Sequence, residues 1–178
     1  MKIIKTTAPF DIIVDKYPLF KVINPKLLKD VEEADFSDPD PHVVSAKMSS
    51  YGTDSKNISI ITNWVYDLIV KYYFPRAHHT FHQLEYYNCW FVKYNLGEEI
   101  FSHHHIPSSF SFVYYVKTPQ NSVPLIFTHS RKRIKAEEGA VAIFPGFVNH
   151  HVPKSRCDAR IVLAGNLYLK HQFLSLQS

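Results

Sequence analysis

Hydrophobic and polar positions follow different periods in the two halves of this chain. Between residues 55 and 73, apolar residues recur every three or four positions, which is the period of an amphipathic helix. These residues are Ile58, Ile61, Val65, Leu68, Ile69 and Tyr72. We expect Trp64 to pack on the same side. Phe74-Pro75 should end this helix, because the residue before a proline disfavours helical backbone.

A shorter helix is expected to begin at Asn24-Pro25. Asparagine is a favoured N-cap and proline fits the first helical turn, so this pair predicts the start of the helix. Its apolar side consists of Leu27, Leu28, Val31 and Ala34. Residues 1–19, interrupted by two prolines, are expected to form short extended pieces.

From about residue 84 the pattern changes to short apolar runs separated by turn residues, which is typical of β-strands. The predicted strands cover residues 86–94, 109–117, 123–128, 140–144, 148–152 and 159–168. A strand through Val43-Val44, followed by a loop over residues 49–52, is expected in the first half. Several short strands at close spacing predict an antiparallel sandwich or barrel.

The 178 residues fit a single domain, 1–178, with a core of its own. We expect a mainly β, α+β architecture. In it, residues 1–83 supply helices that cover one sheet of a barrel formed by residues 84–170. No apolar run is long enough to cross a membrane, and the N-terminus does not resemble a signal peptide. A soluble, cytoplasmic protein is therefore expected.

Charge and cysteine content narrow the choice of function only slightly. The formal net charge of +4 permits an acidic partner such as nucleic acid without requiring one. The basic run at residues 131–135 is expected to be a solvated strand edge or loop, where cations discourage strand association. The alternative is a rim that attracts an acidic substrate. Cys89 is expected to be a buried thiol, and its separation from Cys157 is not that of a metal motif.

The triplet His103-His104-His105 carries the strongest chemical signal. On extended backbone, side chains two positions apart share one face, so His103 and His105 point together and His104 points away. A lone His-x-His is weak evidence in a chain with 11 histidines. His150, after a strand and a turn, is the best-placed third ligand, and Arg160 follows it. Together they indicate a mononuclear non-haem iron centre beside an anion-binding arginine.

Two further histidines are expected to lie outside the ligand set. His151 would point opposite to His150 if that segment is extended, so we expect it to support a ligand or to face the surface. His129 would line the mouth of the pocket or face water.

A longer series of residues surrounds these histidines. Trp90 and Gly97 precede them, and Ser111-Phe112-Val113-Tyr114-Tyr115-Val116 follows them. Phe144-Pro145-Gly146 then leads to His150, and Arg160-Ile161-Val162 leads to Asn166. The series resembles iron(II)- and 2-oxoglutarate-dependent oxygenases with a double-stranded β-helix, in the branch related to prolyl 4-hydroxylases and common in bacteria and phages. The resemblance covers about residues 84–167.

This resemblance implies a jelly-roll or cupin-like barrel that binds iron(II) through His103, His105 and His150. Arg160 would hold the distal carboxylate of 2-oxoglutarate with its planar fork. Tyr115 would donate a hydrogen bond to the same carboxylate, and Tyr94 would line the cosubstrate pocket. The implied reaction uses 2-oxoglutarate and O2 and hydroxylates a C–H bond.

Three positions depart from the family pattern. The second ligand is His105, where most of these enzymes have aspartate or glutamate, so the site has one negative charge fewer. Phe112 replaces a usual glycine, which predicts a narrower space behind that strand. Val162 replaces a usual serine and so lacks a hydroxyl that often helps to hold the cosubstrate.

Two other functions stay open at this point. Three histidines also form the metal site of cupin dioxygenases that need no 2-oxoglutarate, and a barrel with a degenerate site would be a non-catalytic binding module. Arg160 and the strand with Tyr115 favour the interpretation as a 2-oxoglutarate-dependent enzyme. A peptide or protein residue and a small molecule are both possible substrates, with nucleic acid less expected. Residues 36–56 and 74–84 are the expected substrate loops.

Overall fold

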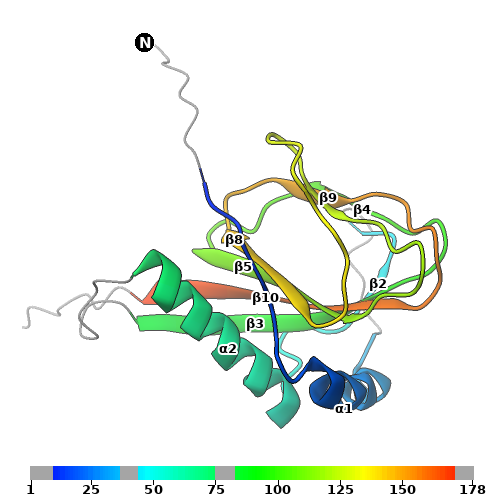
Figure 1. The fold of residues 1–178 in the computed structure, drawn as a ribbon, viewed down its shortest axis with the longest axis horizontal. Coiled ribbons are helices and arrows are strands. Elements are labelled where there is room, and N and C mark those ends of the chain that lie inside the picture. The colour runs from blue at the N-terminus through cyan, green and yellow to red at the C-terminus, as the bar shows by residue number, and fades with distance from the viewer. Residues whose placement is uncertain (1–9, 37–43, 75–82, 171–178) are drawn as a thin grey trace, which may run out of the picture.

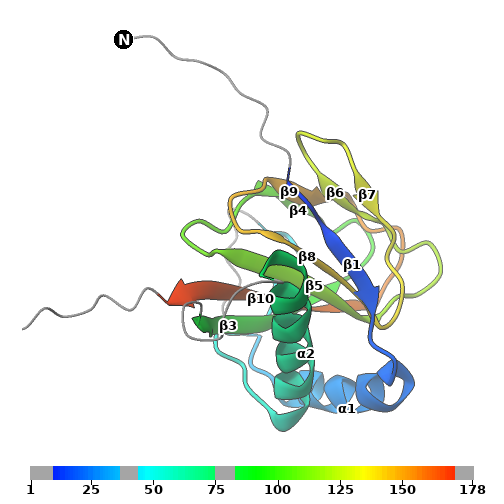
Figure 2. The ribbon, with the colours of Figure 1, turned by 60° about the vertical axis from the view of Figure 1, so that its left-hand side comes forward.

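The computed structural model describes residues 10–36, 44–74 and 83–170. In chain order its elements are β1 (Ile13–Lys16), α1 (Phe20–Glu33), β2 (Lys47–Met48), α2 (Lys56–Tyr73), β3 (Gln83–Tyr94), β4 (Ile100–His103), β5 (Phe110–Lys117), β6 (Leu125–Phe127), β7 (Arg133–Ile134), β8 (Ala140–Pro145), β9 (His150–Val152) and β10 (Arg160–Lys170). The strands form two sheets that face each other, and both helices lie against the larger sheet (Figures 1 and 2).

The strand order shows how the chain alternates between the sheets. The larger sheet has the order β1-β8-β5-β10-β3-β2, and the smaller has β4-β9-β6-β7. The described pairings are all antiparallel, and most neighbouring strands are distant in sequence. This is the connectivity of a double-stranded β-helix, so the predicted fold, with its helices packed on one sheet, is confirmed.

Strand β5 separates two hydrophobic cores. Phe112 and Tyr114 belong to the core beneath the helices, whereas Val113 and Tyr115 belong to the core between the sheets, as the twofold alternation of a strand requires. The helix-side core also includes Ile23, Leu27, Val31, Ile58, Ile61, Val65 and Ile69. Cys89 is fully buried in that core, and both cysteines are free thiols.

Helix α2 confirms the helix predicted from the apolar period. Its N-cap is Ser55, whose Oγ accepts a hydrogen bond from the N–H of Ile58 at 3.1 Å. Trp64 packs against the helix-side core, with its ring 5.1 Å from the ring of Tyr17. Tyr72 is an exception in the predicted apolar stripe, because it is 52% exposed and its hydroxyl donates to Asp11.

The predicted N-cap of the first helix is wrong. Helix α1 begins at Phe20, and Asn24 and Pro25 both lie inside it. The Asn24 amide is buried, where its Nδ2 donates to the carbonyl of Val116 at 2.7 Å and its Oδ1 accepts from the Tyr114 hydroxyl at 2.6 Å. Asn24 therefore ties α1 to β5, and this tertiary role takes precedence over its capping preference.

The six strands predicted in the second half correspond to β3, β5, β6, β8, β9 and β10. The apolar pattern does not predict β4 and β7, which have four and two residues. Val44 forms only an isolated bridge to Ile100, and the strand in that region is β2; Val43 lies outside the described residues. Arg133 lies on β7 at the edge of the smaller sheet, so the strand-edge interpretation of the basic run is confirmed.

None of the helices within the described ranges is both long enough and apolar enough to span a membrane.

Candidate metal centre

Three of the predicted site residues meet at one point between the sheets. His103 ends β4, His150 begins β9, and the two are paired across these strands. His105 lies two residues beyond β4, and its N–H donates to the carbonyl of Gly146 at 2.7 Å. One ring nitrogen from each histidine lies within 4.8 Å of the others, which is a separation that one metal ion can bridge. The structure therefore brings together the three histidines named from the sequence.

Backbone carbonyls orient two of these rings. Nδ1 of His103 lies 2.8 Å from the carbonyl oxygen of Phe101, and Nδ1 of His150 lies 3.0 Å from that of Val148. A carbonyl oxygen only accepts hydrogen bonds, so Nδ1 carries the proton in each ring. Nε2 then has a free lone pair for a metal.

Burial keeps the three imidazoles neutral. Desolvation is the largest cause that lowers the pKa of His103 and His150, and it lowers the pKa of His105 to about 3. The neighbouring histidines lower these pKa values further, since two imidazolium ions at this distance repel each other. At neutral pH the site offers three unprotonated nitrogen donors.

The other histidines take no part in this cluster. His104 is exposed at the border of the cavity, and its Nδ1 accepts from the N–H of Ile106 at 3.3 Å. His151 is half-buried and contacts Thr128 Oγ1, and His129 is exposed. This agrees with the prediction that His103 and His105 share one face and that His151 points away from His150.

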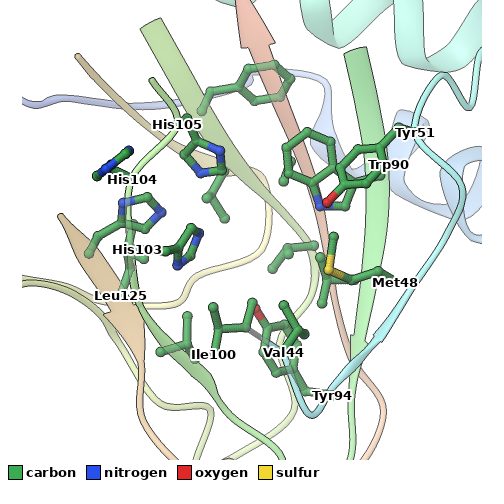
Figure 3. A pocket seen from close by; sticks show the side chains of 17 residues that line it. Val44, Met48, Tyr51, Trp90, Tyr94, Ile100, His103, His104, His105 and Leu125 are labelled. Atoms are coloured by element: carbon green, nitrogen blue, oxygen red, sulfur yellow. The ribbon is translucent and has the colours of Figure 1, made fainter. Parts of the chain in front are cut away.

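A cavity of about 210 Å³ adjoins the histidines. Figure 3 shows His103 and His105 on one wall, with Trp90 and Tyr51 across from them and Tyr94 farther along. Its other walls are mainly apolar and include Val44, Met48, Ile100, Val152, Val162 and Ala164. No aspartate or glutamate is among the described residues that line it. The cavity is thus a small, largely apolar chamber with a nitrogen-donor cluster in its wall.

Arg160 lies beside the Tyr94 end of this cavity and has no partner there. It is fully buried, and its three guanidinium nitrogens form no hydrogen bond with the described residues. Its guanidinium carbon lies 4.6 Å from the ring centroid of Tyr94 and 5.6 Å from that of Tyr115, whose hydroxyl is also unpartnered. A buried charge without a counterion costs several kcal/mol, so this arrangement indicates a site for an anion.

The two tyrosines beside Arg160 are hydrogen-bond donors at neutral pH. Burial is the largest cause that raises the pKa of both Tyr94 and Tyr115, and the nearby guanidinium lowers it only in part. Tyr94 is the strand partner of Arg160, and Tyr115 is the strand partner of Val162. Val162 itself has no hydroxyl, but its strand partner Tyr115 has one that forms no hydrogen bond with the described residues.

Phe112 is one of the residues that line the cavity, and it also belongs to the helix-side core. The ring packs in the helix-side core over Gly165, its strand partner on β10. A Cβ atom at Gly165 would lie 2.5 Å from the Phe112 ring. Gly165 on the neighbouring strand β10 therefore leaves the space that the Phe112 ring occupies behind β5.

Sequence reasoning missed the aromatic wall opposite the histidines. Tyr51 packs edge-on against Trp90 with ring centroids 4.9 Å apart, and Trp90 lies 5.9 Å from the ring of His105. Tyr51 is held there by a loop whose Ser49 accepts a hydrogen bond from the N–H of Phe91 at 2.9 Å. The alternation of Trp90 with Tyr94 on β3 was the available signal, since both residues face the same side.

Comparisons with known proteins agree with this fold. No family model and no curated protein sequence matches the chain. Among solved structures, the viral collagen prolyl hydroxylase of Paramecium Bursaria Chlorella virus-1, in a 2-oxoglutarate complex, has a TM-score of 0.66 and 12% identity, over 86% of this chain and 94% of that one. A Pseudomonas putida prolyl-4-hydroxylase has a TM-score of 0.65 and 13% identity, over 89% and 92%.

A third structure widens the group. A Burkholderia pseudomallei oxidoreductase of the 2OG-Fe(II) oxygenase family has a TM-score of 0.61 and 11% identity, over 88% of this chain and 84% of that one. The chain therefore has the double-stranded β-helix fold of prolyl hydroxylases and 2OG-Fe(II) oxygenases. At these identities the likeness establishes the fold, and the chemistry has to be argued from the site.

Proposed function

We propose that this protein is an iron(II)- and 2-oxoglutarate-dependent oxygenase that hydroxylates a C–H bond of its substrate. One observation carries the proposal: a cluster of three histidines lines a small cavity, and a buried arginine without a counterion contacts Tyr94 in the wall of that same cavity. The first offers a metal site with open positions, and the second offers a carboxylate site. The solved structures with this fold support the same pairing, since one of them is a 2-oxoglutarate complex.

The donor set fits iron(II). Imidazole nitrogen suits iron, zinc, copper and nickel, and three donors close together leave coordination positions free on a six-coordinate metal. His103, His105 and His150 would hold the ion. Hydrogen bonds from His103 and His150 to backbone carbonyls fix their rings, so the donors need little rearrangement on binding.

The surroundings of Arg160 fit one end of 2-oxoglutarate. The planar guanidinium can bind a carboxylate through two parallel hydrogen bonds, and the Tyr115 hydroxyl can add a third. Tyr94 contacts Arg160 and also lines the cavity, so the ligand space extends from the arginine side toward the histidines.

When bound, iron and 2-oxoglutarate supply the oxidation, in which O2 converts the cosubstrate to succinate and carbon dioxide and one oxygen atom enters the substrate. The protein's own residues hold and shield these components. Arg160 and Tyr115 fix the far carboxylate of the cosubstrate, and the histidines set the position of the metal. The apolar walls around Val152 and Val162 exclude water, which strengthens the charge interactions inside.

Substrate size can be bounded from the cavity. Sites that enclose a complete small-molecule ligand typically measure about 300–1,000 Å³. At about 210 Å³, this cavity has room for a cosubstrate and for little more than the reacting group of a substrate. We therefore propose a peptide or protein residue, or the end of a small molecule, presented from the mouth. Tyr51 lies at the cavity within one of the expected substrate loops; residues 37–43 and 75–82 lie outside the described residues.

The rival without 2-oxoglutarate has one observation in its favour, namely the three-histidine donor set. It gives no role to the buried, unpaired guanidinium of Arg160. A non-catalytic module could bind a metal or an anion, but that function does not require both sites beside one cavity.

Anaerobic titration of the metal-free protein distinguishes these functions. Iron(II) is added first and 2-oxoglutarate second, while the visible spectrum is followed for the weak metal-to-ligand charge-transfer band. We expect a band that needs both components and is lost in Arg160→Gln but kept in Arg156→Gln, a matched change at an exposed arginine. Metal binding without the band would favour a three-histidine dioxygenase or a binding module.

A further inference from the structure

We propose that the histidine site binds a divalent metal tightly only together with a dianionic chelating ligand, so that metal and 2-oxoglutarate load as a coupled pair. This inference rests on the proposed function and concerns how its two components depend on each other. It follows from a charge imbalance. Among the residues that the structure describes, no acidic side chain belongs to the histidine cluster, lines the cavity or pairs with Arg160.

Neither the ligands nor the groups that support them bring negative charge. An imidazole binds a metal as a neutral donor. Metal-binding histidines commonly donate their second N–H to a carboxylate, a backbone carbonyl or water. Here His103 and His150 use the carbonyls of Phe101 and Val148. The described part of the site thus stabilises a metal through neutral dipolar groups and provides no full negative charge.

A bound divalent ion would therefore add two positive charges to a cavity whose wall residue Tyr94 already contacts the buried Arg160 guanidinium. Like charges in a poorly hydrated interior repel each other far more strongly than they do in water. Three imidazoles stabilise the ion by donation, but they do not cancel this repulsion. The metal alone is consequently expected to bind weakly.

A chelating dianion changes this balance. It reduces the summed charge of metal and guanidinium from three to one, and a molecule with carboxylates at both ends can contact both cations. Tyr94, which lines the cavity and contacts Arg160, marks the path between the two ends. Because coupling between two ligands is reciprocal, the metal must raise the affinity for the dianion by the same factor.

The wild-type protein tests this directly. Anaerobic calorimetry measures the affinity for Mn(II), a redox-stable probe, without ligand, with 2-oxoglutarate and with its neutral dimethyl ester. We expect 2-oxoglutarate to raise the Mn(II) affinity by at least about tenfold, within the usual range of coupling between sites. The ester should change the Mn(II) affinity by less than about twofold, since the ester has the shape of 2-oxoglutarate without its charge.

If 2-oxoglutarate binds but leaves the Mn(II) affinity unchanged, the coupling is refuted and the proposed function stands. If 2-oxoglutarate binds neither with nor without metal, both fail.

Two variants at one ligand isolate the role of charge. His105→Asp supplies an anionic ligand, and His105→Asn is its neutral control of equal length. We expect the aspartate variant to bind Mn(II) more tightly without ligand than the asparagine variant does, and its coupling to fall below about threefold. Equal coupling in the two variants would refute the charge explanation. Circular dichroism checks that both are folded; if either is not, the comparison of 2-oxoglutarate with its ester in the wild-type protein decides.

Discussion

Arg160 and Tyr94 are partners on the neighbouring strands β10 and β3, and the guanidinium carbon of Arg160 lies 4.6 Å from the centre of the Tyr94 ring. This cation–π contact is the main stabilising interaction that the described residues give the buried charge, because its nitrogens have no hydrogen-bond partner. A contact of about 2 kcal/mol does not offset the desolvation of an arginine. The buried Arg160 therefore lowers the free energy of unfolding of the ligand-free protein, and we expect a bound anion to compensate for this cost.

Arg160→Met should separate stability from binding. Removing an unpaired buried charge is expected to stabilise the ligand-free protein by about 1–3 kcal/mol, which a rise in its melting temperature would reveal. The same change should weaken 2-oxoglutarate binding by about 3 kcal/mol, or more than a hundredfold, because the carboxylate loses its partner. Calorimetry on metal-loaded protein measures this loss. Arg156→Met, at an exposed position, serves as control, and unchanged affinity in Arg160→Met would rule out its role as anchor.

His103→Ala and His150→Ala should each abolish tight metal binding and leave the fold intact. Either change removes one of three donors that lie within 4.8 Å of one another, and two imidazoles are a poor site for iron(II). Metal content after dialysis in the presence of 2-oxoglutarate, where the wild-type protein is expected to keep its metal, is measured by elemental analysis, and circular dichroism checks the fold. His104→Ala is the matched control from the same triplet, because its exposed ring is not in the cluster. Full metal occupancy in His150→Ala would show that the ligand set is wrong.

The sequence predicted the histidine cluster because local geometry determines half of it. Alternation along an extended segment brings His103 and His105 together, and no information from elsewhere in the chain is needed. The pairing of His103 with His150, in contrast, depends on the register of β4 against β9. His150 was chosen as the third ligand because it follows a strand and a turn, and the resemblance to a known family supported that choice, but the register itself could not be predicted.

The failures of the sequence prediction have a common physical cause. Asn24 was expected to cap a helix, but its amide bonds to Tyr114 and Val116, about 90 positions away in sequence. Tyr51 stands in the cavity wall because Ser49 is bonded to β3 across 42 positions. Side chains whose position depends on such distant partners cannot be placed from local pattern alone.

Asn24→Ala should destabilise the protein by about 1–3 kcal/mol. The change leaves the Tyr114 hydroxyl and the Val116 carbonyl buried without their hydrogen-bond partner, and an unsatisfied buried polar group costs that much. Urea denaturation measures the loss. In Tyr114→Phe the hydroxyl is absent, so a further Asn24→Ala change should cost less than it does in the wild-type protein. If the stability losses of Asn24→Ala and Tyr114→Phe simply add in the double variant, the hydrogen bond between Tyr114 and Asn24 contributes no stability.

Gly165→Ala should also destabilise the protein, by about 1–3 kcal/mol, through crowding. The added methyl group would lie 2.5 Å from the ring of Phe112 and 3.0 Å from the backbone oxygen of Asn88. Phe112→Leu removes part of the ring that causes the first clash. We therefore expect Gly165→Ala to cost less free energy of unfolding in the Phe112→Leu background. An equal cost in both backgrounds would mean that contact with the Phe112 ring is not what makes alanine unfavourable at position 165.

Acid should weaken the metal-free protein well above the range in which carboxylates titrate. In the folded state burial lowers the pKa of His105 to about 3 and that of His150 well below its usual value, whereas both titrate near 6.5 in the unfolded chain. Below pH 6.5 the unfolded state thus binds more protons, and the free energy of unfolding must fall as the pH falls. Each histidine that stays neutral contributes a loss of about 1.4 kcal/mol between pH 7.5 and 5.5. Urea denaturation at these two pH values should show a loss of roughly 3 kcal/mol, and less in His150→Asn. A stability that does not change over this interval would mean that these imidazoles are protonated as readily in the folded protein as in the unfolded chain, and so that the site is open to water.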